Sequence, residues 1–360
     1  MRIIFGIKFM GGANAVLPVA KEALKNKDDI TVFADTNGPA YAKLASSDLL
    51  VVLSNYAPDK FLDFFKPDAV VVSSMCTNDP VNLQLLWEAK KRSIKTVLVE
   101  DFWGDYGIKR WHGNYPDLIC VQDAFAKDLV LSAWSGYIDN QVRITGQPGF
   151  DCLHQIDRQE AKKNLRKKFN LHFDCPIIYF SGFEDGMTEA LSITVDALNE
   201  VDKPVYFFLR HHPRVLAPNA PEEVRKIPQA CQDITKKLRR GWVLDSMALT
   251  TTEEVYSGAD MVVGTLDSVS LIEACYLGIP CVAIQTETRR KALSEGTDGL
   301  LSTFPLCRVG ACLEGSDMKE LKECFSQILS GNTTEMLTAQ KSYCLSDGQS
   351  ASRVYAVIKE

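Results

Sequence analysis

Side chains that can bind a phosphate or move a proton follow several predicted strands in the second half of the chain. Ser268 and Ser270 come after one apolar, β-rich run, and Arg210 and His212 come after another. In open α/β sheets, ligands bind beyond the carboxyl ends of the strands, where helix N-termini present unpaired N–H groups and a partial positive charge. The positions of these residues therefore predict a phosphate-binding edge on a parallel sheet.

The stretch Gly264–Ile284, GTLDSVSLIEACYLGIPCVAI, carries the strongest part of this pattern. Asp267 or Ser268 can cap the helix that follows the first strand, and a phosphate can bind the helix N-terminus without a charged side chain. Glu273 lies about one and a half turns into the helix, within reach of hydroxyls attached to that phosphate, such as those of a ribose. The alternative is that Asp267 is only an N-cap and that Glu273 is an exposed carboxylate near a favourable dipole.

A second strand end carries the run Arg210-His-His-Pro-Arg214. Arginine can fork onto a phosphate, and a histidine such as His212 can donate a hydrogen bond to a departing phosphate oxygen. A solvated basic turn is the alternative. The residues that we expect to bind the nucleotide and its phosphates are Gly12, Gly182, Arg210, His212, Thr265, Asp267, Ser268, Ser270 and Glu273.

Two further strand ends carry polar clusters. The loop Gly182–Gly186 follows a third predicted strand and contains Glu184 and Asp185. Either acid can act as a base, or both can cap the following helix, and capping is slightly favoured. The polar residues after a fourth strand are expected to face either the sugar or the other domain, and they are Thr286, Arg289 and Arg290.

Two segments in the first half of the chain have features of a binding site. Gly11-Gly12-Ala13-Asn14 follows the first predicted strand and opens a helix, a geometry that suits a phosphate, but it lacks the full G-x-G-x-x-G motif, and a tight turn is favoured. Glu100 and Asp101 follow the strand Thr96–Val99 beside aromatic residues. Such carboxylates suit a general base next to a sugar, because burial raises a carboxylate pKa toward neutrality. Solvated acids beside core aromatic residues are the alternative.

Short apolar runs alternate along the chain with amphipathic segments that have helical patterns, such as Pro18–Lys25. This alternation predicts parallel sheets covered by helices. The densest turn signal in the middle of the chain is Gly146–Cys152, and the alternation restarts after it. We therefore expect two doubly wound, Rossmann-like α/β domains, residues 1–150 and 151–345, facing one another across a cleft. The predicted strands are Arg2–Phe9, Ile30–Ala34, Leu49–Leu53, Ala69–Ser73, Thr96–Val99, Leu118–Gln122 and Val142–Thr145, then Ile177–Ser181, Val205–Leu209, Trp242–Asp245, Met261–Gly264 and Cys281–Gln285.

The composition excludes several classes of protein. Hydrophobic residues make up 46% of the 360 residues and charged residues 24%, which is typical of a soluble globular protein. The formal net charge of -6 argues against a surface built for nucleic acid. The 11 cysteines show no C-x-x-C spacing, and several lie in apolar patterns, which indicates reduced core residues in a cytoplasmic protein. The sequence predicts no signal peptide and no transmembrane segment.

Three segments, in order along the chain, carry a resemblance to a known family. Asp267–Thr297, DSVSLIEACYLGIPCVAIQTETRRKALSEGT, resembles the nucleotide-binding stretch of the UDP-N-acetylglucosamine 2-epimerase and glycosyltransferase superfamily with the GT-B fold. Thr145–Asp151 is similar to its interdomain Thr-Gly-Asn-x-x-x-Asp, and Ser346–Val354 is similar to its Gly-Asp-Gly-x-Ala-x-x-Arg-Ile. The resemblance implies an acceptor side in the first domain, a nucleotide-sugar site in the second, and a last helix within residues 346–360 that packs back on the first domain.

The sequence departs from the epimerase pattern where that pattern carries the chemistry. It has Gly6–Met10, GIKFM, where epimerases have Gly-Thr-Arg-Pro-Glu, and Ser181–Gly186, SGFEDG, in place of their His-Arg-x-Glu-Asn loop. Glu184-Asp-Gly186 and His212-Pro213 resemble short motifs of bacterial sialyltransferases, and His-Pro also occurs in polyol-phosphate transferases. The resemblance therefore implies that the nucleotide site is kept while the epimerase chemistry is altered.

Together, these patterns predict a GT-B glycosyltransferase that moves a sugar from a nucleotide-sugar donor, UDP-linked, to a glycan or lipid-linked acceptor hydroxyl in cell-surface polysaccharide synthesis. Glu100 or Asp101, or else Asp185, would take the acceptor's proton, while Arg210 and His212 would stabilise the leaving phosphate. No Asp-x-Asp motif is present, so we expect no obligatory metal and no other cofactor. The alternatives are a 2-epimerase, a CMP-sialic acid or polyol-phosphate transferase, and an inactive nucleotide-sugar-binding protein. The sequence leaves the oligomeric state open.

Overall fold

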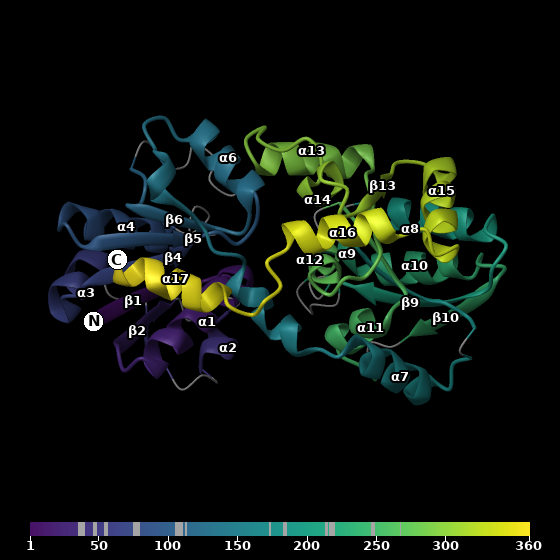
Figure 1. Cartoon of the computed structure of the whole chain (residues 1–360), viewed down its shortest axis with the longest axis horizontal. Coiled ribbons are helices and arrows are strands. Elements are labelled where there is room, and N and C mark those ends of the chain that lie inside the picture. Colours follow the sequence, from purple (N-terminus) through teal and green to yellow (C-terminus); the bar gives the residue numbers. More distant parts are fainter. Residues whose placement is uncertain are drawn as a thin grey trace. The chain divides into compact units, whose positions relative to one another are not determined.

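The computed structural model divides into two compact units, which are described separately. Unit 1 comprises Met1–Cys152, Gly296–Leu300 and Leu345–Glu360, and unit 2 comprises Leu153–Glu295 and Leu301–Cys344. Figure 1 labels the elements of both units. The structure describes every residue except 35–39, 46–48, 54–56, 75–79, 105–110, 112–113, 173, 183–185, 213–214, 216–219, 246–248 and 267.

Unit 1 is built on a parallel sheet whose described strands run in the order β3-β2-β1-β4-β5-β6-β7. Ile3 of β1 lies opposite Ile30 of β2 on one side and opposite Ala69 of β4 on the other. Strands of a parallel sheet are covered on both faces and are therefore apolar along their length, and every residue of β4 is buried. The strands are β1 (Arg2–Ile7), β2 (Asp29–Ala34), β3 (Leu50–Leu53), β4 (Ala69–Ser73), β5 (Lys95–Val99), β6 (Leu118–Val121) and β7 (Val142–Ile144).

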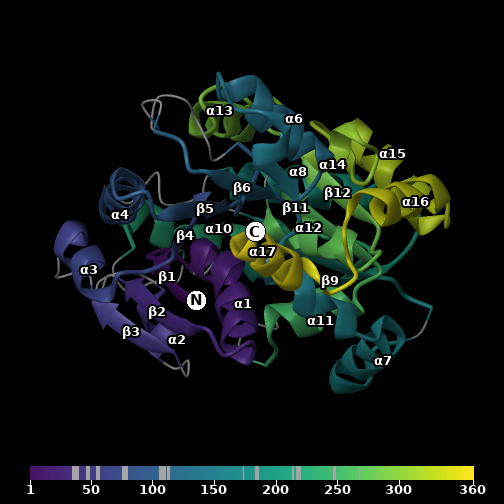
Figure 2. The same ribbon diagram turned by 60° about the vertical axis from the view of Figure 1, so that its left-hand side comes forward.

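Helices cover both faces of the first sheet. On one face α1 and α17 lie side by side, and Val16 and Val354 share an apolar core with Phe5 of β1 (Figure 2). On the opposite face, Phe61 of α3 packs against Phe33 of β2 with ring centroids 4.5 Å apart. The helices are α1 (Met10–Lys25), α2 (Tyr41–Ala45), α3 (Pro58–Phe65), α4 (Pro80–Lys91), α6 (Ala124–Ala133) and α17 (Ser350–Lys359).

The last helix, α17, is held on unit 1 by polar contacts as well as by its apolar face. Lys95 Nζ donates to the carbonyls of Val357 (2.8 Å) and Ile358 (3.0 Å), where the helix dipole favours a cation. Tyr355 Oη donates to Asp28 Oδ2 at 2.7 Å. The C-terminal segment therefore belongs to the same unit as the N-terminal part of the chain.

Unit 2 contains a second parallel sheet whose described strands run in the order β10-β9-β8-β11-β12-β13. In both units the chain builds the sheet outward in one direction, returns to the middle, and then builds outward in the other. This reversal falls between β1 and β4 in unit 1 and between β8 and β11 in unit 2, and a reversal of this kind opens a crevice at the carboxyl ends of the strands. The strands are β8 (Ile177–Gly182), β9 (Val205–His211), β10 (Gly241–Asp245), β11 (Met261–Thr265), β12 (Cys281–Ile284) and β13 (Leu313–Gly315).

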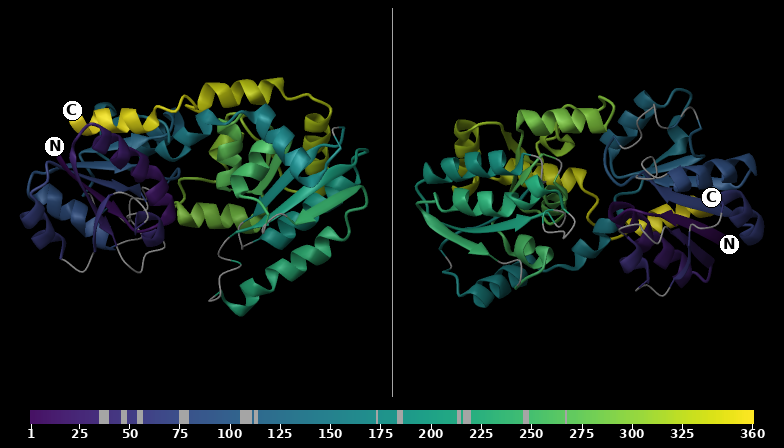
Figure 3. Two further views of the ribbon diagram at one scale, coloured as in Figure 1. Left: turned by 90° about the horizontal axis from the view of Figure 1, so that it is seen from below. Right: turned by 180° about the vertical axis from the view of Figure 1, so that it is seen from behind.

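Helices also cover both faces of the second sheet (Figure 3). One face is covered by α8, α10 and α15 around a core that includes Leu191, Cys231 and Phe325, and the other is covered by α7, α11 and α12. No helix in the described part of the chain is long and apolar enough to span a bilayer. The helices are α7 (Arg158–Phe169), α8 (Met187–Asn199), α9 (Glu222–Arg225), α10 (Ile227–Thr235), α11 (Thr252–Gly258), α12 (Val269–Tyr276), α13 (Glu287–Gly296), α14 (Pro305–Arg308), α15 (Met318–Leu329) and α16 (Thr334–Tyr343).

The predicted strands are all present, with ends that differ by at most two residues, and the helical pattern Pro18–Lys25 forms the second half of a longer helix. Helix α1 begins at Met10 and contains Pro18, because buried residues on both sides of the proline carry the helix through the one lost hydrogen bond. Gly11 and Gly12 lie in its first turn, so the favoured tight turn there is wrong. The sequence does not predict β13, because three residues are too few to show alternation.

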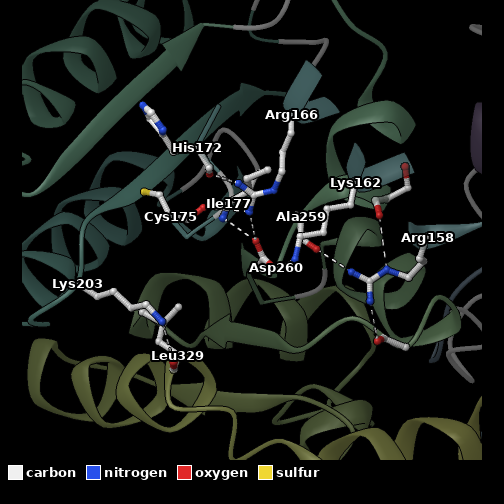
Figure 4. Close-up of polar contacts among 12 residues, drawn as sticks. Arg158, Lys162, Arg166, His172, Cys175, Ile177, Lys203, Ala259, Asp260 and Leu329 are labelled. Carbon is white, nitrogen blue, oxygen red and sulfur yellow. Dashed lines mark hydrogen bonds and ion pairs between the residues drawn. The ribbon is translucent and has the colours of Figure 1, made fainter. Parts of the chain in front are cut away.

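An ion-pair network joins α7 to the amino ends of β8 and β11 (Figure 4). Asp260, the residue before β11, pairs with Lys162 and with Arg166, whose Nη2 lies 3.2 Å from Asp260 Oδ2. The same oxygen accepts a hydrogen bond from the backbone N–H of Ile177 at 2.9 Å. Arg166 is only 3% exposed and also donates to two carbonyls of the loop after α7. Asp260 therefore neutralises a buried cation and fixes α7 against the sheet.

Asp260→Asn is expected to lower the free energy of unfolding by about 2–4 kcal/mol, because Arg166 would remain buried without its counterion. The measurement is urea denaturation at pH 7 followed by tryptophan fluorescence. Glu254→Gln is the matched control, because it removes the charge of an exposed pair with Lys168 and keeps a side chain that can complete the capping box of α11. The control should change the free energy by less than about 0.5 kcal/mol. Equal effects of the two substitutions would contradict the assignment of a special role to Asp260.

Candidate functional site

The start of α12 lies at the reversal point of the second sheet, between the carboxyl ends of β8 and β11. Ser268 occupies the N-cap position, but among the described residues, which do not include Asp267, its side chain makes no capping hydrogen bond. Its Oγ lies instead 2.9 Å from the Oγ of Ser181 on β8. The hydroxyl pair joins the two strand ends, and the first-turn N–H groups of α12 face the same edge. The helix dipole favours an anionic group at this position.

Two glycines allow the backbone to come this close. A Cβ on Gly264 of β11 would lie 3.1 Å from Ser268 Cβ and 3.2 Å from Leu271 Cγ, so a side chain there would push α12 away from the strand. A Cβ on Gly182 would lie 3.0 Å from Met187 Cγ. Thr265 is fully buried at the end of β11, so it supports this turn from behind and exposes no atom to a ligand.

Two buried tyrosines orient the polar residues of α12. Tyr179 of β8 hydrogen-bonds with the side chain of Ser270, and Tyr256 of α11 hydrogen-bonds with Glu273. The two rings lie 6.3 Å apart, and both side chains are at most 2% exposed. Ser270 and Glu273 lie three residues apart and therefore share a face of the helix. Their positions are thus fixed from below by partners on two other elements.

Burial changes the titration of Glu273. The loss of hydration raises its pKa to about 8; the hydrogen bond from Tyr256 lowers the pKa, and the negative charge of Glu253 raises it further. Burial also raises the pKa of Tyr179 to about 12, so this hydroxyl stays protonated near neutral pH. A carboxyl group that titrates near pH 8 at a sheet's binding edge can accept hydrogen bonds from ligand hydroxyls in a pH-dependent way.

The guanidinium of Arg210 contacts Thr250, just before α11. Its Nη1 and Nη2 donate to the carbonyl of Thr250 at 3.0 and 2.9 Å, and Nη1 also donates to Thr250 Oγ1 at 3.0 Å. Arg210 therefore holds the segment that leads into α11 and Tyr256. His212 follows β9 with a partly exposed side chain, whereas Pro213 and Arg214 lie outside the described residues.

The loop after β8 meets the segment after β12. A Cβ on Gly186, which has a φ of +76°, would lie 3.4 Å from Thr286 Oγ1 and 3.5 Å from Arg289 Cγ. Thr286 is buried and its Oγ1 accepts the N–H of Arg289 at 3.3 Å, so it caps α13. The predicted acids of this loop, Glu184 and Asp185, lie outside the described residues.

Arg289 and Arg290 do not share one environment, although they are neighbours in the sequence. Arg289 is buried beside Gly186, whereas Arg290 is exposed and lines a separate hollow of about 390 Å³ with Glu314, Ser316 and other residues. Successive residues of a helix point about 100° apart, which accounts for the difference. The structure therefore brings Arg289 and Thr286 to the β8 loop and leaves Arg290 outside this group.

In unit 1, the first turn of α1 is already occupied by a carboxylate. A Cβ on Gly11 would lie 2.2 Å from Asp101 Oδ2, so the carboxylate packs directly against this glycine. Gly12, in the same turn, is buried. Asp101 therefore lies against the first turn of α1, which contains the glycine that the sequence predicts to bind a phosphate.

The adjacent acid, Glu100, is 2% exposed and accepts the backbone N–H of Gln122 at 3.0 Å. Gln147 lies between β7 and α7, and its side-chain amide donates to the carbonyls of Glu100 (3.0 Å) and Asp101 (2.9 Å). Glu100 is therefore a buried residue that fixes the backbone, whereas Asp101 keeps part of its surface exposed. Of the two predicted bases, Asp101 is the one that a substrate can touch.

Several residues that shape the site are not predicted from the sequence. Tyr179 and Tyr256 lie in apolar patterns, and a tyrosine in such a pattern reads as an ordinary core residue. Gln147 and Thr250 act through contacts with residues about 40 positions away in the sequence. Ser181 could be found, because it is a small polar residue at the carboxyl end of a predicted strand.

Comparison with known proteins supports the fold that these sheets describe. No protein-family model matches the sequence, and no curated protein matches it. Among solved structures, MurG of Acinetobacter baumannii superposes with a TM-score of 0.69 at 12% identity, covering 99% of each chain. UDP-GlcNAc 2-epimerase of Neisseria meningitidis, bound to UDP-GlcNAc, has a TM-score of 0.68 at 17% identity, covering 100% of each chain. The chain has the GT-B fold.

A third solved structure with a similar fold is also described as a UDP-GlcNAc 2-epimerase. UDP-GlcNAc 2-epimerase of Methanocaldococcus jannaschii, in complex with UDP-GlcNAc and UDP, superposes with a TM-score of 0.58 at 16% identity, covering 99% of each chain. The fold implied by the resemblance of Asp267–Thr297 is therefore confirmed. At such identities the likeness establishes the GT-B fold itself, and the activity has to be argued from the residues of the site.

Glu273→Gln is expected to flatten part of the pH dependence of stability. Between the ordinary carboxyl pKa of about 4.3 and the folded value of about 8, the folded protein holds a proton that the unfolded chain has released. The wild type should therefore lose stability as the pH rises through this window, and the glutamine variant should lose less. The measurement is the free energy of unfolding by urea at intervals from pH 5 to 9.

The matched control for this experiment is Glu200→Gln, because Glu200 is a solvent-exposed carboxylate just after α8. Its pH profile should follow that of the wild type. Parallel profiles for the wild type and Glu273→Gln would show that Glu273 keeps an ordinary pKa and would contradict its buried, protonated state.

Proposed function

We propose that the protein is a glycosyltransferase that moves a sugar from a nucleotide-sugar donor, UDP-linked, to an acceptor hydroxyl. The observation that carries the proposal is the start of α12, which lies at the reversal point of the sheet. Within the described residues, the side chain of its N-cap residue, Ser268, makes no capping hydrogen bond, and buried tyrosines hold Ser270 and Glu273 on one face of the helix. Two proteins with this fold are described as bound to UDP-GlcNAc. The same features support an enzyme that binds a nucleotide by its diphosphate and ribose.

The donor would be held by backbone and hydroxyl groups of unit 2. The first-turn N–H groups of α12, with Ser268 and Ser270, would bind the diphosphate, and Glu273 would accept hydrogen bonds from the ribose. As the sugar–oxygen bond breaks, negative charge develops on the leaving diphosphate, and these preorganised donors would stabilise it. His212 would donate to the same phosphate, while Arg210 would act by holding Thr250 and the start of α11.

The acceptor would be deprotonated by a carboxylate. Asp101 fits this role better than Glu100, because its side chain is partly exposed whereas that of Glu100 is buried. Asp185 is the second proposed base, and Glu184, Thr286 and Arg289 would contact the sugar from the loop after β8 and the start of α13. Arg290, which faces another hollow, would not.

The proposed setting is the cytoplasm, with a glycan or lipid-linked acceptor for cell-surface polysaccharide synthesis. Free, buried cysteines such as Cys120, Cys275 and Cys281 support a reducing compartment. We propose no metal and no other cofactor, because the N–H and hydroxyl donors of α12 can stabilise the diphosphate. Nucleic acid is not a proposed partner, given the net charge of -6.

A 2-epimerase is the second proposed function. It is favoured by the likeness to structures described as UDP-GlcNAc 2-epimerases, which would use the same nucleotide site. The sequence around the end of β1 argues against it, since Gly6–Met10 has Lys8 in place of the arginine and Met10 in place of the glutamate of the epimerase pattern. An epimerase would convert its UDP-sugar without an acceptor, whereas a transferase would consume the donor only with an acceptor present.

The first test is thermal unfolding with UDP, CMP, CDP, GDP and their sugar conjugates. A ligand at about a hundred times its Kd adds roughly 2.7 kcal/mol of stability, so we expect UDP species to raise the midpoint clearly. Glu273→Ala should weaken UDP binding by about threefold to tenfold at pH 7, the range expected for a lost hydrogen bond to a neutral carboxyl group. Glu200→Ala, on the surface after α8, should leave binding unchanged.

The outcomes of this test separate the alternatives. A response to CMP species alone would replace the UDP proposal with a sialyltransferase-like reaction, and no response to any nucleotide would refute a nucleotide site at α12. If UDP-sugars bind, donor consumption is then measured by chromatography with and without glycan acceptors. Binding without consumption or epimerisation in any mixture would contradict both enzymatic proposals and favour a nucleotide-sugar-binding protein.

A further inference from the structure

A second polar hollow lies at the opposite edge of the second sheet from the start of α12. It has a volume of about 280 Å³ and is formed at the amino ends of β8 and β11, which begin just after Pro176 and Asp260. Its charged lining consists of Lys162, Arg166 and Lys203 together with Asp174 and Asp260. The net formal charge of these five side chains is therefore +1.

The two aspartates do not cancel this charge equally. Asp260 is bound by Lys162, Arg166 and a backbone N–H, so its oxygens already have partners (Figure 4). Asp174 is exposed, so water screens its charge. Asp260 neutralises Arg166, so the excess positive charge of the hollow comes from the ammonium groups of Lys162 and Lys203, opposite the exposed carboxylate of Asp174.

Both lysines keep donors for a ligand. Lys203 Nζ donates to the carbonyl of Leu329 at the end of α15 (3.3 Å), and Lys162 Nζ donates to Asp260 (Figure 4). An ammonium group has three N–H donors, so each lysine has N–H groups beyond the contact it makes within the described chain. The lysines come from α7 and from the loop between α8 and β9, so they approach the hollow from different elements.

The N-cap residue of α16 also lines this hollow, and the first turn of that helix carries the carboxylate of Glu335. Thr333 lines the hollow and occupies the N-cap position of this ten-residue helix, but within the described residues its side chain makes no capping hydrogen bond. The first-turn N–H groups of α16 therefore have no side-chain acceptor from the N-cap residue, and the helix dipole favours an anion beside them. Ammonium groups and a helix N-terminus thus converge on one cavity.

We propose that this hollow binds a phosphate group between Lys162, Lys203 and the first turn of α16. A tetrahedral oxyanion can accept hydrogen bonds from several directions at once, which suits donors that come from three elements. The phosphate is either inorganic phosphate or the phosphate of a small monoester. The site lies at the amino edge of the sheet, so it is separate from the proposed nucleotide site and does not depend on it.

The test is thermal unfolding of the full chain during titration with sodium phosphate, compared with sodium chloride at equal ionic strength. The wild type should show a saturable rise in the midpoint that chloride does not reproduce. Lys203→Met keeps most of the aliphatic stem and removes the charge, so it should weaken the apparent affinity at least about tenfold. Lys163→Met is the matched control, since Lys163 lies on α7 but is exposed outside the hollow, and its titration should match the wild type.

A second variant separates binding from folding. Thr333→Asp places a carboxylate at the N-cap, which should cap α16 and keep or raise the midpoint without phosphate, while it repels the anion and removes the response. Repeating the titration with glycerol 3-phosphate distinguishes inorganic phosphate from a phosphate monoester, because the preferred ligand should saturate the rise in the midpoint at the lower concentration. Three outcomes would overturn the proposal. The first is a wild type whose midpoint does not respond saturably to phosphate, and the second is an equal response in the wild type, Lys203→Met and Thr333→Asp. The third is an equal loss of phosphate affinity in Lys203→Met and Lys163→Met.

Discussion

The hydrogen-bond ladder of a parallel sheet constrains where this protein can do chemistry. Strands covered by helices on both faces satisfy their backbone groups only with one another, so polar side chains are excluded from the strand interiors and gather at the ends. In unit 2 the strand order reverses between β8 and β11, and Ser181 and Ser268 meet there through their hydroxyls. The geometry of the proposed donor site follows from this one topological feature and from the glycine that lets α12 approach the strand.

The same site keeps features that stability alone would remove. A helix whose N-cap serine bonds to another strand, and a carboxyl group whose pKa burial raises to about 8, are both unfavourable for folding. They are held in place by well-packed neighbours, since Tyr179 and Tyr256 lie in the core beneath them. An uncapped helix start and a destabilised carboxylate within a well-packed region are typical of functional sites.

The two units use one topology in different ways. In unit 1, the first turn of α1 is filled by Asp101, so the chain itself supplies the anion that the helix dipole favours. In unit 2, among the described residues, neither the first turn of α12 nor that of α16 is capped by its N-cap side chain. The two proposed anion sites therefore both lie in unit 2, at opposite edges of the same sheet.

The sequence by itself determined the parallel sheets, nearly all strand positions and the polar clusters at the strand ends, because alternation and turn residues are local signals. The resemblance of Asp267–Thr297 also pointed to the GT-B fold, which the structural likeness confirms. Local signals did not determine every element boundary. Helix α1 begins at Met10 and continues through Pro18, because the residues on both sides of the proline are buried.

Only the tertiary structure decided which polar residues face the proposed ligand. It turned Arg210 toward Thr250, placed Asp101 against Gly11, separated Arg289 from Arg290, and brought Tyr256 to Glu273. Each of these outcomes depends on a partner from another element or on the rotation of a helix about its axis. A sequence pattern carries the period of an element but not the identity of its neighbours, so these contacts could not be predicted from it.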